Sequence, residues 1–124
     1  MYKKPIWILG SIIMITLGLF TTYIHLSVST ATHEPIIVTL TEEGYEPQNL
    51  TIPKGTVVIF TTTRDSHHWP ASDLHPSHSI YPEFDPLEPI PPEESWQFTF
   101  DRTGNWDFHD HLRSYYRGTI NVIE

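Results

Sequence analysis

His109 and His111 are separated by one residue in a segment, residues 106–122, that reads as a strand, a loop and a final strand. Side chains two residues apart in an extended strand point to the same face. The two imidazoles should therefore stand side by side, with Asp110 turned the other way. Neutral imidazole is the commonest protein ligand for metal ions such as copper and zinc. The spacing predicts part of a metal site on this strand.

A second group of histidines lies between His67 and His78, and six of the chain's eight histidines fall in these two groups. His68 follows a predicted strand, and its neighbour His67 should face the other way. His75 and His78 have the spacing His-x-x-His, which a loop can fold onto one ion. We therefore predict five metal ligands. They are His68, His75, His78, His109 and His111.

The chain has no cysteine, which excludes thiolate metal sites, thiol nucleophiles and disulfide bonds. A site built from several imidazoles without sulfur favours Cu(II), with Zn(II) as the alternative. Asp73, Glu83 and Asp85 could add an oxygen ligand, or an acceptor that orients a histidine from outside the site. We expect these carboxylates to act chiefly as loop caps and turn formers.

Short alternating runs separated by Gly and Pro turns dominate the chain from residue 36 onward. Within one of these runs, Trp96, Phe98 and Phe100 fall on one face. No helical period is visible, so an all-β sandwich of about seven strands is predicted. The clearest strand segments are residues 36–40, 50–52, 56–62, 95–100, 105–109 and 118–123.

Residues 70–92 hold most of the chain's eleven prolines and little strand signal. A long segment without regular structure inside a compact domain is usually functional or disordered. This one contains Tyr81 and Phe84 besides two histidines, which is not the composition of a disordered tail. We expect an ordered loop packed over one end of the sandwich.

The N-terminal part has the pattern of a membrane anchor. Its apolar run carries no Asp, Glu, Lys or Arg, and about 20 such residues suffice for a helix to cross a membrane. Lys3 and Lys4 precede the run and all fifteen acidic residues follow it, so the positive-inside rule exports the rest of the chain. A cleaved signal peptide is the alternative, although the run is longer than the usual signal. The expected order is a cytoplasmic N-terminus (1–5), a transmembrane anchor (6–28), a linker (29–35) and a domain (36–124) on the periplasmic or cell-surface side.

The exported part is acidic, and the whole chain has a formal net charge of −8. Nucleic-acid binding needs the opposite charge balance, so this class of partner is excluded. The expected partners are a metal ion, the membrane through the N-terminal helix, and an extracytoplasmic protein.

Three segments resemble the cupredoxin family. Residues 44–61 (GYEPQNLTIPKGTVVIFT) resemble its aromatic-x-Pro pattern followed by a Gly turn and a strand that leads to a ligand loop. Residues 103–111 (TGNWDFHDH) resemble the strand before the blue-copper cysteine, and residues 117–122 (RGTINV) resemble the closing strand. The resemblance covers nearly the whole exported part. It implies a Greek-key β-sandwich and favours copper over zinc.

The C-terminal ligands of a type 1 copper site do not carry over. Counting back from Gly118, Asp110 stands at the family's cysteine, Arg113 at its histidine and Tyr116 at its methionine. Without a Cys thiolate the chain is excluded as a blue-copper electron carrier. Asp110 should be partly buried and paired with Arg113 or Arg64, because a buried carboxylate needs such a partner.

Residues 108–112 (FHDHL) resemble instead the His-Cys-His strand of multicopper oxidases, with Asp110 in place of the cysteine. In those oxidases the flanking histidines bind a separate copper cluster on the other face of the strand. The resemblance implies that His109 and His111 are ligands of a non-blue site. One small domain cannot supply a trinuclear cluster, so a mononuclear site is expected.

These observations predict a membrane-anchored, extracytoplasmic module that binds copper at a His-only site, for copper binding, storage or delivery. The alternatives are a metal-free interaction domain of the same fold and a zinc site. The sequence has no HExxH motif, phosphate loop or Ser-His-Asp order, so we expect no enzyme.

Overall fold

The computed structural model describes residues 33–124, so the predicted anchor over residues 6–28 lies outside the described residues. Within the described part, no helix has the length and apolar character needed to cross a membrane. The described part contains eight strands. They are β1 (Ile36–Leu40), β2 (Tyr45–Glu46), β3 (Asn49–Pro53), β4 (Thr56–Thr62), β5 (Pro70–Ser72), β6 (Trp96–Phe100), β7 (Gly104–Asp110) and β8 (Arg113–Ile123).

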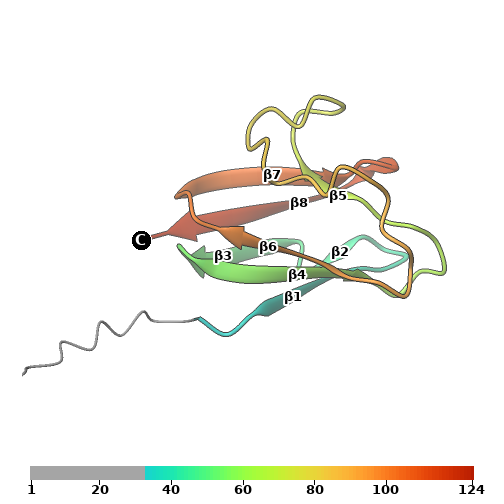
Figure 1. Cartoon of the computed structure of the whole chain (residues 1–124), viewed down its shortest axis with the longest axis horizontal. Helices are drawn as coiled ribbons and strands as arrows, with labels where there is room; N and C mark the ends of the chain where they lie inside the picture. Colours follow the sequence, from blue (N-terminus) through green and yellow to red (C-terminus); the bar gives the residue numbers. More distant parts are fainter. Residues whose placement is uncertain (1–32) are drawn as a thin grey trace, which may run out of the picture.

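The strands form two four-stranded sheets, ordered β2-β1-β4-β6 and β3-β8-β7-β5, which lie face to face (Figure 1). The chain crosses repeatedly between the sheets, so that β1 runs parallel to β4 and β3 parallel to β8. The remaining pairs are antiparallel. This arrangement confirms the predicted all-β sandwich.

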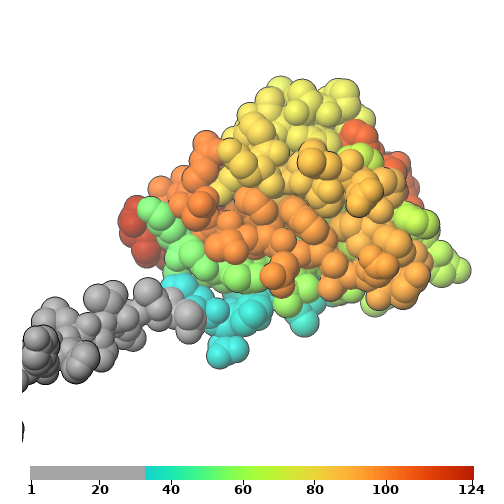
Figure 2. Space-filling view, in the orientation of Figure 1, coloured from blue at the N-terminus to red at the C-terminus, as the bar shows by residue number. Residues whose placement is uncertain are grey.

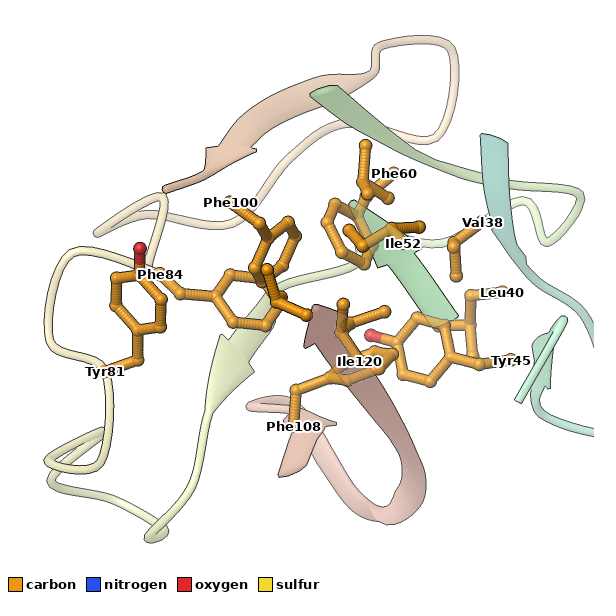
Figure 3. Close-up of a cluster of buried hydrophobic side chains, with 12 residues drawn as sticks. Val38, Leu40, Tyr45, Ile52, Phe60, Tyr81, Phe84, Phe100, Phe108 and Ile120 are labelled. Carbon is orange, nitrogen blue, oxygen red and sulfur yellow. The ribbon is translucent and has the colours of Figure 1, made fainter. Parts of the chain in front are cut away.

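The core lies between the sheets and is rich in aromatic side chains (Figure 3). It forms because the strands alternate apolar and polar residues, as in β4, where Val58 and Phe60 are fully buried. Gly118 allows β7 and β8 to approach, since a Cβ atom there would lie 2.6 Å from the Phe108 ring. The predicted aromatic face of β6 is present, with Phe100 buried and Trp96 and Phe98 packed against the core.

The proline-rich segment is ordered, as predicted, but its first residues are not a loop. Residues 70–72 form β5, the edge strand beside β7. Proline lacks an N–H group and is tolerated at the start of an edge strand, which is where Pro70 lies. Further along, Tyr81 and Phe84 belong to the core, where Phe84 packs against Phe100 at 5.0 Å between ring centroids.

The segment between β5 and β6 also rises above the β7–β8 sheet, where it is yellow in Figure 1. The space-filling view shows it as a raised cap on this side of the molecule (Figure 2). The two buried aromatic residues hold the cap to the sandwich, and the cap carries His75 and His78 over the end of β7.

Candidate metal centre

The end of β7 turns its side chains alternately inward and outward. Phe108 packs in the core, and the register between β7 and β8 shifts between His109 and Asp110. Beyond this bulge His111 follows in the turn to β8, and its N–H donates to the Trp69 carbonyl oxygen at 2.8 Å. His109 and His111 lie on the same side, with 6.4 Å between their ring centroids, as the alternation predicts.

Four of the five predicted histidines converge on one point. The group consists of His75, His78, His109 and His111, and one nitrogen of each ring lies within 4.8 Å of those of the others. His75 Nδ1 is 3.1 Å from His109 Nε2, and His78 Nε2 is 2.9 Å from His111 Nδ1. One histidine comes from β7, one from the turn after it and two from the cap, so the fold brings together residues more than thirty positions apart. We call this group the histidine cluster.

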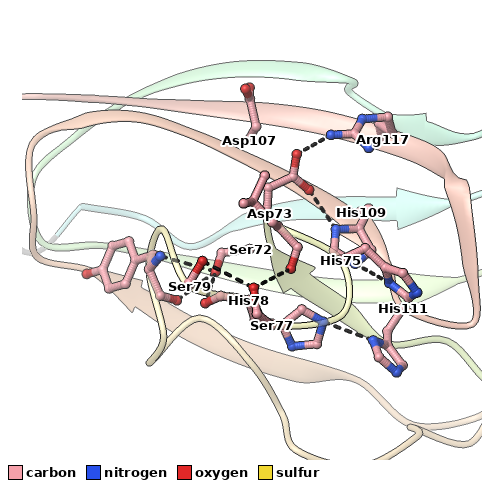
Figure 4. A network of polar contacts seen from close by, with 12 residues as sticks. Ser72, Asp73, His75, Ser77, His78, Ser79, Asp107, His109, His111 and Arg117 are labelled. Carbon is pink, nitrogen blue, oxygen red and sulfur yellow. Dashed lines mark hydrogen bonds and ion pairs between the residues drawn. The ribbon is translucent and has the colours of Figure 1, made fainter.

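Asp73 holds the ring of His109 in place (Figure 4). His109 Nδ1 is 2.6 Å from Asp73 Oδ1, and neither residue is more than slightly exposed. A carboxylate accepts the Nδ1 proton, which leaves the lone pair on Nε2 facing the cluster. Asp73 Oδ2 in turn accepts a hydrogen bond from Arg117, the residue opposite His109 in β8. This chain of contacts fixes both the tautomer and the direction of the His109 ring.

Asp85 does the same for His78. His78 Nδ1 is 2.6 Å from Asp85 Oδ2, so His78 Nε2 faces the cluster. Asp85 Oδ1 accepts hydrogen bonds of 2.8 Å from the indole N–H of Trp69 and from the Leu87 N–H. Asp73 and Asp85 therefore accept hydrogen bonds that orient histidines, one of the roles that the sequence analysis considered for these carboxylates. Glu83 has no such role and pairs at the surface with Arg102.

The electrostatics of the cluster favour neutral imidazole, the form that binds metals. Burial lowers the pKa of His109, and the hydrogen bond to Asp73 only partly opposes this shift. Burial also lowers the pKa of His111, assisted by the nearby His78 and His75. Burial alone would raise the pKa of Asp85, but the hydrogen bonds it accepts, first from His78, bring the pKa below its usual value.

His68, the fifth predicted ligand, does not join the cluster. Its ring is fully buried, Nε2 lies 3.3 Å from the Glu94 carbonyl oxygen, and the charges that reach it are those of Asp110 and Arg113. Burial lowers the pKa of His68. Its main chain bridges Ile90, and its ring is not among those whose nitrogen atoms converge. Of the five histidines predicted as ligands, four therefore converge and His68 lies apart from them.

The inner side contains the buried ion pair that the sequence predicted for Asp110. Asp110 is fully buried, and its Oδ2 accepts a 2.9 Å hydrogen bond from Arg113. Its Oδ1 accepts a 2.7 Å bond from the Trp69 N–H. Of the two proposed partners Arg113 is therefore the one observed, whereas Arg64 pairs with Glu42.

Trp69 and Arg117 contribute to the site although the sequence analysis assigned them no role. The indole of Trp69 packs against the His111 ring, with 4.5 Å between centroids, besides donating to Asp85. Trp69 lies between β4 and β5, where the sequence predicts no strand, so alternation gave no signal for it. For Arg117 the signal was the β7–β8 pairing, which sets it opposite His109.

A family model described as cupredoxin-like domain matches residues 11–122 of the chain. The chain belongs to this family. A purple cupredoxin from Nitrosopumilus maritimus is 20% identical, with a TM-score of 0.62 over 71% of this chain and 99% of that protein. An amicyanin variant is also 20% identical, with a TM-score of 0.61 over 76% of this chain and 87% of its own.

A copper-containing nitrite reductase from Thermus scotoductus is similar over 73% of this chain but only 23% of its own, at 24% identity and a TM-score of 0.61. At these identities the likenesses show the fold alone. A search among curated proteins found no match.

Two places in this cupredoxin-like chain are candidates for a metal ion, the type 1 position and the histidine cluster. At the type 1 position Asp110 stands in place of the cysteine thiolate and Arg113 in place of the histidine. The Arg113 guanidinium pairs with Asp110 and supplies the positive charge that a metal ion would bring there. A blue-copper centre therefore does not fit. The histidine cluster does fit a metal ion, because four nitrogen atoms converge and two of the rings are held with their Nε2 lone pairs directed inward.

Proposed function

We propose that this protein is a copper-binding module with a non-blue centre made of histidines alone, serving copper storage or delivery. The observation that carries the proposal is the pair of carboxylate–histidine contacts, Asp73–His109 and Asp85–His78, behind four converging imidazoles. Such outer contacts raise ligand basicity and orient the ring, and they accompany most histidine metal ligands. A surface group of histidines without a metal role has no need of two such contacts.

Copper is favoured over zinc by the general affinity order of divalent metals for nitrogen ligands, in which Cu(II) stands above Zn(II). A site without sulfur and with several imidazoles suits either ion, so zinc is the alternative.

The test is a metal analysis of the purified protein after exposure to equimolar Cu(II) and Zn(II) and gel filtration. We expect one copper ion per chain, a tetragonal electron-spin resonance spectrum, and only a faint blue colour, since no sulfur is present for intense charge transfer. His109→Ala should abolish stoichiometric binding. His67→Ala, a matched change of an exposed histidine outside the cluster, should not.

Three results would count against this proposal. An intense band near ~600 nm would refute the ligand assignment, because a blue centre requires a thiolate. Preferential retention of zinc would favour the zinc alternative. Absence of any bound metal would favour a metal-free interaction domain.

A further inference from the structure

The four histidines of the cluster differ in how firmly the protein holds them. His78 and His109 are 5% and 0% exposed, and a carboxylate at 2.6 Å fixes each ring. His75 and His111 have no carboxylate contact among the described residues, and the only side-chain hydrogen bonds of their rings are to the other two histidines. We call His78 and His109 the anchored pair, and His75 and His111 the free pair.

The free pair is also the accessible one. His75 is exposed and His111 half-buried, and both lie on the outer edge of the cluster. The neighbouring Leu74 and Leu112 are 61% and 43% exposed. Trp69 packs against the His111 ring, so His75 is the more open of the two. A donor atom from outside can therefore approach a metal in the cluster on this side, whereas the anchored pair closes the other side.

We propose that copper enters and leaves through this edge by ligand exchange at His75, while the anchored pair keeps its bonds until the last step. The inference rests on the proposed copper-binding function and adds its route of transfer. The incoming ligand is a nitrogen or oxygen donor of the molecule that accepts the copper. One copper–imidazole bond to His75 breaks as one bond to the incoming donor forms, and the copper keeps its oxidation state. The released imidazole stays neutral.

The expected order of ligand strength differs from the order that strand or loop position alone would predict. His109 is in β7 and His111 follows in the short turn to β8, whereas His75 and His78 are in the cap, so closeness to the strand alone would make His111 a stronger ligand than His78. The cap is already held by its buried aromatic residues, however, and Asp85 fixes His78. Anchoring therefore ranks His78 with His109 and places His111 with His75.

The first test compares Cu(II) affinity for four single alanine variants of the full chain in detergent, by competition with a chromophoric chelator. We expect His78→Ala and His109→Ala to lose about 100-fold or more, and His75→Ala and His111→Ala about 10-fold. Asp85→Asn should lose about 10–100-fold, the usual effect of removing an outer contact. Near-ultraviolet circular dichroism of each metal-free variant shows whether it folds. Asp85→Asn alters no ligand and keeps the test valid if His109→Ala is misfolded.

The second test measures the rate of copper transfer to nitrilotriacetate by stopped flow. For the parent the rate should rise with chelator concentration, and His75→Ala should transfer about 10-fold faster, while His67→Ala matches the parent. A rate independent of chelator, or a His75→Ala rate equal to that of the parent, would overturn the exchange route. So would an affinity loss larger for His111→Ala than for His78→Ala. A parent chain that binds no Cu(II) would overturn the proposed function as well as the exchange route. A parent chain that binds Cu(II) but fails these comparisons would overturn the exchange route alone.

Discussion

Asp110 connects the two sides of β7. Its carboxylate accepts from Arg113 on the inner side, and from the main chain of Trp69, whose indole packs on His111 on the outer side. The ion pair occupies the position at which the resemblance to cupredoxins would place the cysteine and histidine of a type 1 site. Asp110 thus forms an ion pair on the inner side of the strand and, through Trp69, helps to support His111 on the outer side.

Arg113→Ala should destabilise the protein by about 3 kcal/mol, because it leaves the carboxylate of Asp110 buried without its charged partner. The free energy of unfolding from urea titration of the metal-free protein measures this loss. Lys54→Ala is the control, since it removes the same charge from an exposed position, and we expect it to change the free energy by less than about 0.5 kcal/mol. Equal stability of the two variants would contradict a buried ion pair.

Acidification should release the metal and also weaken the metal-free fold. The pKa values of His109 and His111 are lowered in the folded protein, chiefly by burial. The unfolded chain binds these protons near the ordinary pKa of about 6.5, so below that pH it takes up more protons than the folded chain. Stability should therefore fall as the pH drops from about 6.5 through the lowered pKa values.

Copper itself should be lost over roughly pH 6 to 4.5, because several imidazoles must stay neutral together. Dialysis at stepped pH followed by metal analysis gives the curve. Retention of all the copper at pH 4 would indicate carboxylate ligands in place of the histidines.

The cap between β5 and β6 joins the core to the site. Phe84 is fully buried among the aromatic residues of β6 and β7, and Tyr81 Oη donates to Asp101 at 2.6 Å. Burial, assisted by that hydrogen bond, raises the pKa of Tyr81 to about 12, so the phenol stays neutral. The position of His75 and His78 therefore depends on packing some distance from the cluster.

Phe84→Ala should cost about 3–5 kcal/mol of stability, the usual effect of removing a buried aromatic side chain. It should also weaken copper binding, since the cap loses its attachment although no ligand changes. Leu87→Ala, in the same segment but 78% exposed, is the matched control and should affect neither property. Urea unfolding and chelator competition on both variants make the comparison. Unchanged affinity in a folded Phe84→Ala protein would show that the cap orders itself independently.

The strands were predictable where packing and alternation agree. The predicted segments 36–40 and 56–62 are β1 and β4 to the residue, because each buries every second side chain. β5 was missed because a three-residue edge strand that begins with Pro70 has no alternation to detect. β8 begins at Arg113, earlier than the predicted 118, because exposed tyrosines and arginines conceal its first half.

The histidine cluster was only partly predictable, and for a physical reason. The spacing of His109 and His111 correctly predicted that they lie on one side, although His111 lies in the turn just beyond β7. The approach of His75 and His78 to the other two histidines depends on where Phe84 packs. That packing is a contact between distant segments, which spacing along the sequence does not report. The separation of His68 from the cluster likewise depends on the path of the main chain past Ile90.

For the molecule as a whole, we propose attachment to a membrane through residues 6–28, with the domain on the extracytoplasmic side. The support is the uncharged apolar run after Lys3 and Lys4, and the acidic residues that follow it. In a cell fractionation the full chain should sediment with membranes, whereas a chain of residues 33–124 should not. Protease added to intact spheroplasts should digest the domain. Protection from the protease would place the domain inside the cell.

Burial of Tyr81 and Phe84 has a consequence for how quickly the protein responds to scarce metal. In many small metal-binding domains the chain folds only when the ion binds, and the conformational entropy lost on folding lowers the affinity for the ion. Here hydrophobic packing has ordered the cap beforehand, so capture should proceed with a heat-capacity change near zero, because little apolar surface is newly buried. The rate of metal capture should then be limited by the encounter with the ion and by the loss of water from the ion, rather than by folding.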